Sequence, residues 1–161
     1  MELSNNLNSG LKIVGMKDAD VSTLEKPVIS TLALATCVVV LLYNEDKKTA
    51  IVAHLSTDWR ETIEKVFELI LTHKLDSSYI KYKIIPGYYP NHYQVKEDVE
   101  KIFDSMAPMF IPFGDNEVDN DIEIDKQTTS KRFAFDSISG RFVTKFIDFS
   151  KVVVDNKNKT I

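Results

Sequence analysis

Cys37 is the only cysteine in the chain, and it stands seventeen residues before His54 in the segment STLALATCVVVLLYNEDKKTAIVAH. A cysteine thiol becomes a strong nucleophile when a neighbouring imidazole accepts its proton. Thr31, six residues before the cysteine, can hold that imidazole in one tautomer through its hydroxyl or carbonyl. The backbone N–H groups of Thr36 or Cys37 are candidates for an oxyanion hole. Together these residues suit nucleophilic attack on a carbonyl carbon.

The strands around Cys37 must bring the thiol and the imidazole together. The runs VVVLLY and TAIVAH are rich in β-branched residues and flank the polar NEDKK, so they predict a β-hairpin that is apolar on both faces and central in a sheet. If the hairpin loop is even and centred between Glu45 and Asp46, Cys37 lies directly opposite His54. Directly opposed side chains have Cβ atoms about 4.5 to 5.5 Å apart, within reach of a hydrogen bond. An odd loop or a bulge would change this pairing.

An inert role is the alternative for both side chains. Free cysteine is among the most frequently buried residue types, and Cys37 opens an apolar run. A histidine at the end of a strand, such as His54, is often structural. Their joint placement with a nearby threonine favours a catalytic pair, in which we expect His54 to stabilise a reactive Cys37 thiolate.

The rest of the chain predicts an α+β domain. The segments DWRETIEKVFELILTHKL and QVKEDVEKIFDSM have the periodicity of amphipathic helices. Thr57 or Asp58 can cap the first helix, and the second ends before Pro108. The expected apolar stripe of the first helix comprises Trp59, Ile63, Val66, Phe67, Ile70 and Leu71. The segments LKIVGM, YIKYKII, KRFAFD, RFVTKFIDF and KVVVD predict strands, and PGYYPNHY predicts a loop after the second of them.

Length and composition limit the classes to which the protein can belong. A chain of 161 residues with 43% hydrophobic and 27% charged residues fits one globular domain, which we expect at 11–161 after a mobile, Asn-rich segment 1–10. The longest apolar run, Val38 to Tyr43, is too short to span a membrane. The start of the chain does not resemble a signal peptide, which predicts a cytoplasmic protein or an effector exported without a classical signal.

Charge and ligand spacing argue against two further classes. The net charge is −4 and no basic stripe is visible, so we expect no nucleic-acid partner. The three histidines lack the short spacings of zinc sites, so we expect no metal and no cofactor. Acidic residues at alternate positions from Asp115 to Asp125 lack the glycine and glutamate placement of an EF-hand, and predict a solvated loop or a charged strand edge.

The segment with Thr31, Cys37 and His54 resembles the active-site segment of the chemotaxis receptor glutamine deamidase family CheD. It is also similar to protein N-terminal asparagine amidohydrolases, whose ATTC-type segment, histidine-ended strand pair, helix and Gly-aromatic loop parallel LATC, AIVAH, DWRETIEKVFELIL and KYKIIPGYY here. Bacterial glutamine-deamidating toxins share that fold. The resemblance covers residues 28 to 105. Ala35 and Thr36 stand where CheD proteins have glycine and serine, and KKTAIVAHLSTDW replaces their glycine-rich strand and HFMLP-type ending.

The resemblance implies mixed β-sheets packed as a sandwich with helices outside. It implies a Cys37, His54 and Thr31 triad that deamidates a Gln or Asn side chain of a protein or peptide. Asp58 is a candidate for binding a free α-amino group if the substrate is an N-terminal Asn. Two alternatives use the same fold: transglutaminase-like acyl transfer, and a protein-binding module that uses the surface of Tyr88, Tyr89 and Tyr93.

Overall fold

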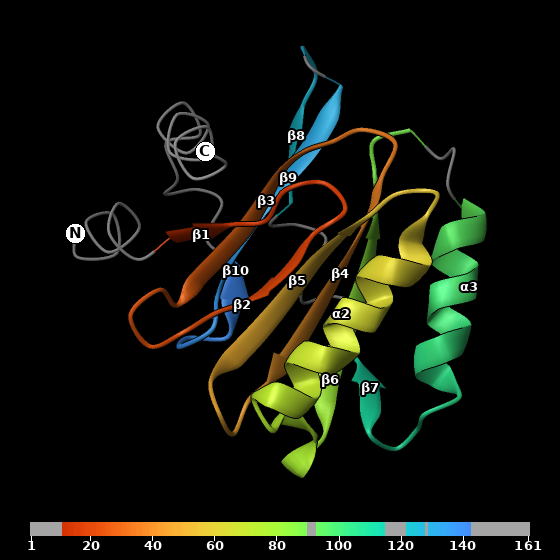
Figure 1. Ribbon diagram of the computed structural model, residues 1–161. Coiled ribbons are helices and arrows are strands. Elements are labelled where there is room, and N and C mark those ends of the chain that lie inside the picture. Colours follow the sequence, from red (N-terminus) through yellow and green to blue (C-terminus); the bar gives the residue numbers. More distant parts are fainter. Residues whose placement is uncertain (1–10, 90–92, 115–121, 128, 143–161) are drawn as a thin grey trace.

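The structure is a computed structural model that describes residues 11–89, 93–114, 122–127 and 129–142 (Figure 1). The expectations for segment 1–10, for KVVVD, for RFVTKFIDF beyond Phe142 and for most of the acidic segment lie outside these residues. The described chain is α+β, with two mixed β-sheets and helices on one side, as the sequence predicted. Within the described residues, no helix is both long and apolar enough to cross a membrane.

The first sheet has five strands, and β3 and β9 form its centre. Strand β3 pairs with β1 in parallel and with β9 in antiparallel orientation, and β9 also pairs with β8 and β10. The strands are β1 (Leu11–Ile13), β3 (Val28–Leu34), β8 (Glu123–Asp125), β9 (Ser130–Asp136) and β10 (Arg141–Phe142).

The second sheet has the order β2-β5-β4-β6-β7, and its only parallel pair among the described strands is β6 with β7. Its strands are β2 (Ala19–Val21), β4 (Val38–Asn44), β5 (Thr49–Leu55), β6 (Ile80–Pro86) and β7 (Phe110–Pro112). The predicted hairpin of VVVLLY and TAIVAH is confirmed as β4 and β5. Both strands have neighbours on either side, which explains why they are apolar on both faces.

Strand β4 contributes to two hydrophobic cores. Val38, Val40 and Leu42 face the helices, whereas Val39 and Leu41 pack in the second core with residues of the first sheet such as Phe133 and Phe135. The side chains of a strand alternate between its two faces, so one continuous apolar run serves both layers. The second core is where Cys37 lies.

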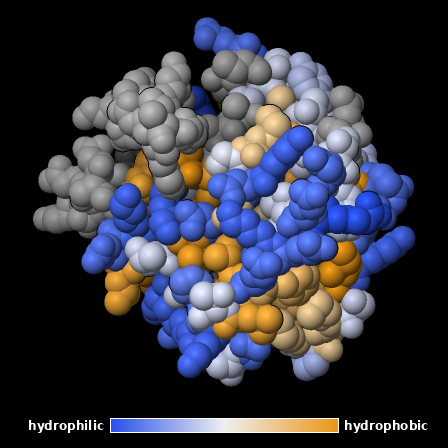
Figure 2. Space-filling model, in the orientation of Figure 1, coloured by the Kyte–Doolittle hydropathy of each residue, from blue (hydrophilic) through white to orange (hydrophobic). Residues whose placement is uncertain are grey.

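Two α-helices cover the outer face of the second sheet (Figure 1). They are α2 (Trp59–Thr72) and α3 (Tyr93–Asp104), and a short 3-10 helix η1 (Leu75–Ser77) follows α2. The predicted stripe of α2 holds except at its end, because Leu71 is 66% exposed. On the face shown in Figure 2, charged and hydrophobic residues are interspersed.

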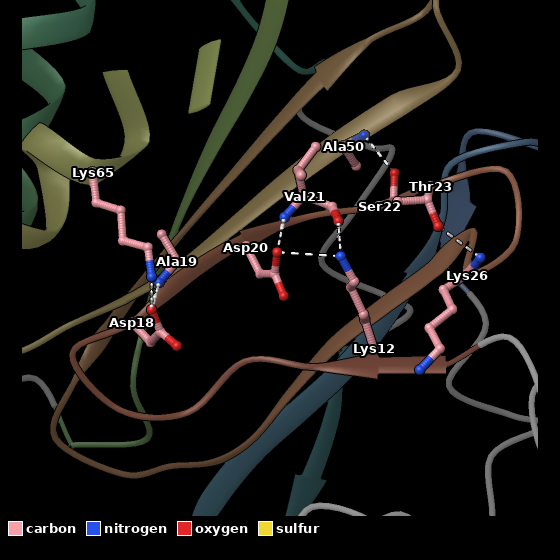
Figure 3. A network of polar contacts seen from close by, with 10 residues as sticks. All are labelled: Lys12, Asp18, Ala19, Asp20, Val21, Ser22, Thr23, Lys26, Ala50 and Lys65. Carbon is pink, nitrogen blue, oxygen red and sulfur yellow. Dashed lines mark hydrogen bonds and ion pairs between the residues drawn. The ribbon is translucent and has the colours of Figure 1, made fainter. Parts of the chain in front are cut away.

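The edges of the two sheets are joined near the start of the fold. Lys12 of β1 donates hydrogen bonds from its ammonium to the Val21 carbonyl at 2.7 Å and to the Asp20 carboxylate at 3.2 Å (Figure 3). Both acceptors belong to β2 of the second sheet. These hydrogen bonds restrain the turn between β1 and β2, and this turn passes the candidate site.

Candidate active site

The register of the β4–β5 hairpin differs from the prediction. Val39 pairs with His54 and Val38 with Leu55, so Cys37 does not lie directly opposite His54. The loop has an even number of residues, as expected. However, Asn44 pairs with Thr49, so the centre of the loop lies one residue later in the sequence than predicted.

The turn chemistry explains this shift. The Asn44 side chain accepts a hydrogen bond from Lys47 N–H at 2.9 Å, and Lys48 adopts a left-handed conformation with φ 51°. Asn44 also donates to the Leu75 carbonyl at 2.8 Å, so its amide is fixed from both sides. These contacts hold Asn44 at the start of the turn, opposite Thr49. The predicted loop centre between Glu45 and Asp46 did not take them into account.

Cys37 and His54 nevertheless belong to the same face of the second sheet. His54 is the direct partner of Val39, and side chains two residues apart on a strand share a face. Cys37 is therefore a diagonal neighbour of His54, a relationship that typically separates residues by about 7 to 8 Å. The predicted direct opposition of Cys37 and His54 is therefore wrong. Their diagonal arrangement still leaves the thiol and the imidazole in one layer between the sheets.

Thr31 reaches His54 from the other sheet. The Thr31 hydroxyl oxygen lies 2.9 Å from His54 Nδ1, and both residues are buried. The β3–β9 register shifts between Thr31 and Leu34, in the segment that leads to Cys37. Such irregularities re-aim strands and are common beside active sites.

The hydrogen bonds of Thr31 define the tautomer of His54. The Thr31 hydroxyl lies 3.0 Å from the Val14 carbonyl, which can only accept, so the hydroxyl hydrogen is used there. Thr31 must then accept a hydrogen from His54 Nδ1. This arrangement leaves Nε2 of His54 with a free lone pair, the form required of a base.

Nε2 of His54 is buried and makes no hydrogen bond to the described part of the chain. A buried polar atom without a partner is uncommon and often has a functional reason. The residue is only 3% exposed, and burial lowers the pKa of His54 to about 4. The imidazole is therefore neutral at neutral pH.

The Cys37 thiol is also held in its neutral form. Cys37 is 8% exposed, and burial raises the pKa of its thiol, against smaller opposing effects from the Thr36 hydroxyl and the positive charge of Lys17. Both pKa shifts disfavour the expected resting thiolate paired with an imidazolium, because both groups are desolvated. No hydrogen bond joins Cys37 to His54 Nε2 in this structure.

The segment after β6 packs directly on the Cys37 loop. Tyr88 N–H donates to the Leu34 carbonyl at 3.0 Å and Tyr89 N–H to the Ala35 carbonyl at 2.8 Å. A Cβ atom at Gly87 would lie 2.4 Å from the Ala35 oxygen and 2.7 Å from the Cys37 oxygen. Only glycine allows this approach, so the Gly-aromatic loop shapes the backbone on which Cys37 stands.

Two other predicted site residues lie at the surface. Thr36 is exposed beside Cys37, where its backbone N–H remains a candidate oxyanion donor. Asp58 stands at the start of α2 but makes no side-chain cap hydrogen bond. Its carboxylate instead accepts from the Ser56 hydroxyl and pairs with Lys17 at 3.3 Å, and the Ser56 hydrogen bond is the main cause of the lowered pKa of Asp58.

The structure adds residues that the sequence reasoning missed. Val14 supplies the carbonyl that orients Thr31, Gly87 supports the Cys37 loop, and Lys17 brings a positive charge near the thiol. Gly87 could have been noticed as the glycine of the Gly-aromatic loop. Neither Val14 nor Lys17 carries a recognisable signal, because each acts through a contact between distant segments.

No family model matches this chain, and no curated protein matches its sequence. The geometry of Cys37, His54 and Thr31 therefore carries the functional argument.

Proposed function

We propose that this chain is a cysteine-dependent amidohydrolase with a CheD-like fold, which converts a Gln or Asn side chain of a protein or peptide to the acid and releases ammonia. The observation that carries the proposal is the unpartnered Nε2 of His54. It belongs to an imidazole whose tautomer is defined by Thr31, and it shares a sheet face with the only cysteine in the chain.

The proposed chemistry starts from a neutral pair. As the Cys37 sulfur bonds to the carboxamide carbon, its proton moves to His54 Nε2, and Thr31 stabilises the resulting imidazolium through Nδ1. The N–H groups of Thr36 and Cys37 would bind the oxygen of the tetrahedral intermediate. When the C–N bond breaks, the imidazolium gives its proton to the departing nitrogen, and ammonia leaves a thioester.

Water completes the reaction. His54 Nε2 takes a proton from water as the water oxygen bonds to the thioester carbon. The C–S bond then breaks, the acid leaves, and the proton returns to the Cys37 sulfur. If an amine replaced water, the same thioester would give a transglutaminase-like product.

The test uses peptide libraries that contain an internal Gln, an internal Asn or an N-terminal Asn. The wild-type chain should release ammonia and convert one amide to the acid, measured by peptide mass spectrometry. Cys37→Ser should abolish this conversion, and Ser30→Ala should retain it, because the Ser30 hydroxyl bonds to Phe133 and not to His54. Absence of Cys37-dependent conversion in every library would contradict hydrolysis, and an amine adduct would favour acyl transfer.

A protein-binding module is the second candidate. Tyr88, Tyr89 and Tyr93 are 37%, 41% and 54% exposed, and the first two rings are in edge-to-face contact with centroids 5.1 Å apart. Exposed tyrosines are common in interfaces. A binding module would lose its partner on Tyr89→Ala and would not be affected by Cys37→Ser, whereas the amidohydrolase requires Cys37.

A further inference from the structure

The chain changes sheets at the end of β6. Strand β6 pairs with β4 in the second sheet up to its last residue. Tyr88 and Tyr89 then donate backbone hydrogen bonds to the carbonyls of Leu34 and Ala35, at the end of β3 in the first sheet. Strands that switch sheets in this way form the corners of β-sandwiches. Residues 86–89, the corner segment, therefore cross the loop between β3 and β4.

Lys131 of β9 ties this corner together. Its backbone pairs with Leu34, directly after the shift in the β3–β9 register. Its ammonium donates to the Pro86 carbonyl at 3.0 Å, in a contact that is partly buried. Leu34 therefore has β9 on one side and the corner segment on the other. One lysine thus joins the strand before the Cys37 loop to the segment that crosses the loop.

Gly87 transmits the position of the corner segment to Cys37. A Cβ atom at Gly87 would lie only 2.7 Å from the Cys37 carbonyl oxygen, so the two backbones are in contact. Cys37 is a diagonal neighbour of His54, and proton transfer needs the sulfur and Nε2 to come within hydrogen-bond reach. The proposed reaction therefore depends on where the backbone of Cys37 is held.

We propose that Lys131 is a positioning residue for Cys37, because its hydrogen bond to Pro86 holds the corner segment on the Cys37 loop. An ammonium that donates to a carbonyl forms a charge-assisted hydrogen bond, which is stronger than one between neutral groups. Without this bond the corner segment opens and the buried thiol becomes accessible. The inference rests on the proposed amidohydrolase function and deepens it, since it names a residue that sets the geometry of the nucleophile.

The test measures the rate at which iodoacetamide labels Cys37 in the folded full chain, together with hydrogen exchange of the Tyr88 and Tyr89 amides. Lys131→Met keeps an unbranched stem but cannot donate, so labelling should be about tenfold faster than in the wild type, and both amides should exchange faster. Lys131→Arg keeps a cationic donor and should restore the wild-type rates. The increase should depend little on added denaturant, because a local opening exposes little surface.

Lys12→Met is the matched control. Lys12 of the first sheet also donates from its ammonium to a carbonyl of the second, that of Val21 at 2.7 Å, but between the edge strands β1 and β2 (Figure 3). The control removes the same kind of bond between the sheets. It should lower the free energy of unfolding and leave Cys37 labelling at low denaturant unchanged.

Three outcomes would overturn the proposal. They are wild-type labelling and exchange in Lys131→Met, an equal increase of labelling in Lys12→Met, and a Lys131→Arg variant that labels as fast as Lys131→Met. If Lys131→Met does not fold, Lys131→Gln serves the same comparison, because its shorter neutral side chain should hold the corner segment less firmly than the ammonium. Labelling and exchange need no substrate, so their outcome is independent of whether the chain releases ammonia from peptides.

Discussion

The Thr31 hydroxyl of one sheet and His54 Nδ1 of the other are 2.9 Å apart, and this hydrogen bond joins the two layers at the candidate site. Thr31 also donates to the Val14 carbonyl. One buried hydroxyl therefore determines which nitrogen of the imidazole is free.

Replacing Thr31 by Val should remove this control while keeping the side-chain shape. The Val14 carbonyl and His54 Nδ1 would each lose a buried partner, so we expect the free energy of unfolding to fall by about 1 to 3 kcal/mol. The imidazole should also populate its second tautomer, which nitrogen NMR of the histidine ring can detect. Thr31→Ser should retain the wild-type tautomer.

Ser30→Ala provides the matched control for Thr31→Val. Ser30 is also fully buried and donates to a carbonyl, that of Phe133 at 2.8 Å, but it does not contact His54. The Ser30→Ala variant should be less stable than the wild type, but the tautomer of His54 should not change. An equal change of tautomer in both variants would show that Thr31 has no specific role.

The buried imidazole of His54 predicts a defined pH dependence of stability. Its pKa is about 4 in the folded chain against 6.5 in the unfolded chain, so the unfolded chain binds the extra proton between these values. The free energy of unfolding should therefore decrease as the pH falls from about 6.5 to about 4, with a contribution of about 3 kcal/mol from His54.

Denaturant unfolding at several pH values measures this contribution as the difference in the free energy of unfolding between the wild-type chain and the His54→Gln variant. Carboxylates titrate in the same range, but their effect is common to both chains. The difference should be constant above pH 6.5 and should shrink toward pH 4. A difference that does not vary with pH would mean that His54 is not desolvated.

Gly87→Ala should strain the Cys37 loop. The added Cβ would lie within 3 Å of backbone atoms of Ala35 and Cys37, which cannot move aside as a flexible side chain can. We expect a loss of about 1 to 3 kcal/mol in chemical denaturation, typical of overpacking. Gly15→Ala is the control in the neighbouring loop, because nothing lies within 4 Å of its added Cβ. Equal stability of the two variants would rule out the close contact.

Alkylation should reveal a protected thiol at Cys37. Because the residue is 8% exposed and burial raises its thiol pKa, iodoacetamide should react more slowly with the folded chain than with the unfolded chain at neutral pH. The measurement compares the two rates by mass spectrometry. Faster labelling of the folded chain at mildly acidic pH would instead indicate a resting thiolate.

Local sequence was sufficient to determine the hairpin and the helices near the site, but it did not predict β3, the strand that carries Thr31. The β-branched runs around NEDKK predicted the β4–β5 hairpin, and apolar periodicity predicted α2 and α3, because these patterns depend on neighbours within a few residues. The positions of Thr31 and Cys37 before the hairpin and of His54 at its end also follow from the sequence. So does the α+β class.

Tertiary structure decided how these residues meet. Asn44 set the register through its contacts with the turn and with Leu75, and this moved Cys37 from a direct to a diagonal neighbour of His54. Packing of the two sheets desolvated both side chains and brought Thr31 to the imidazole. Lys17 reached the site through the β1–β2 turn. Each of these contacts joins segments that are distant in sequence, so their energies depend on the packed layers and not on any local pattern.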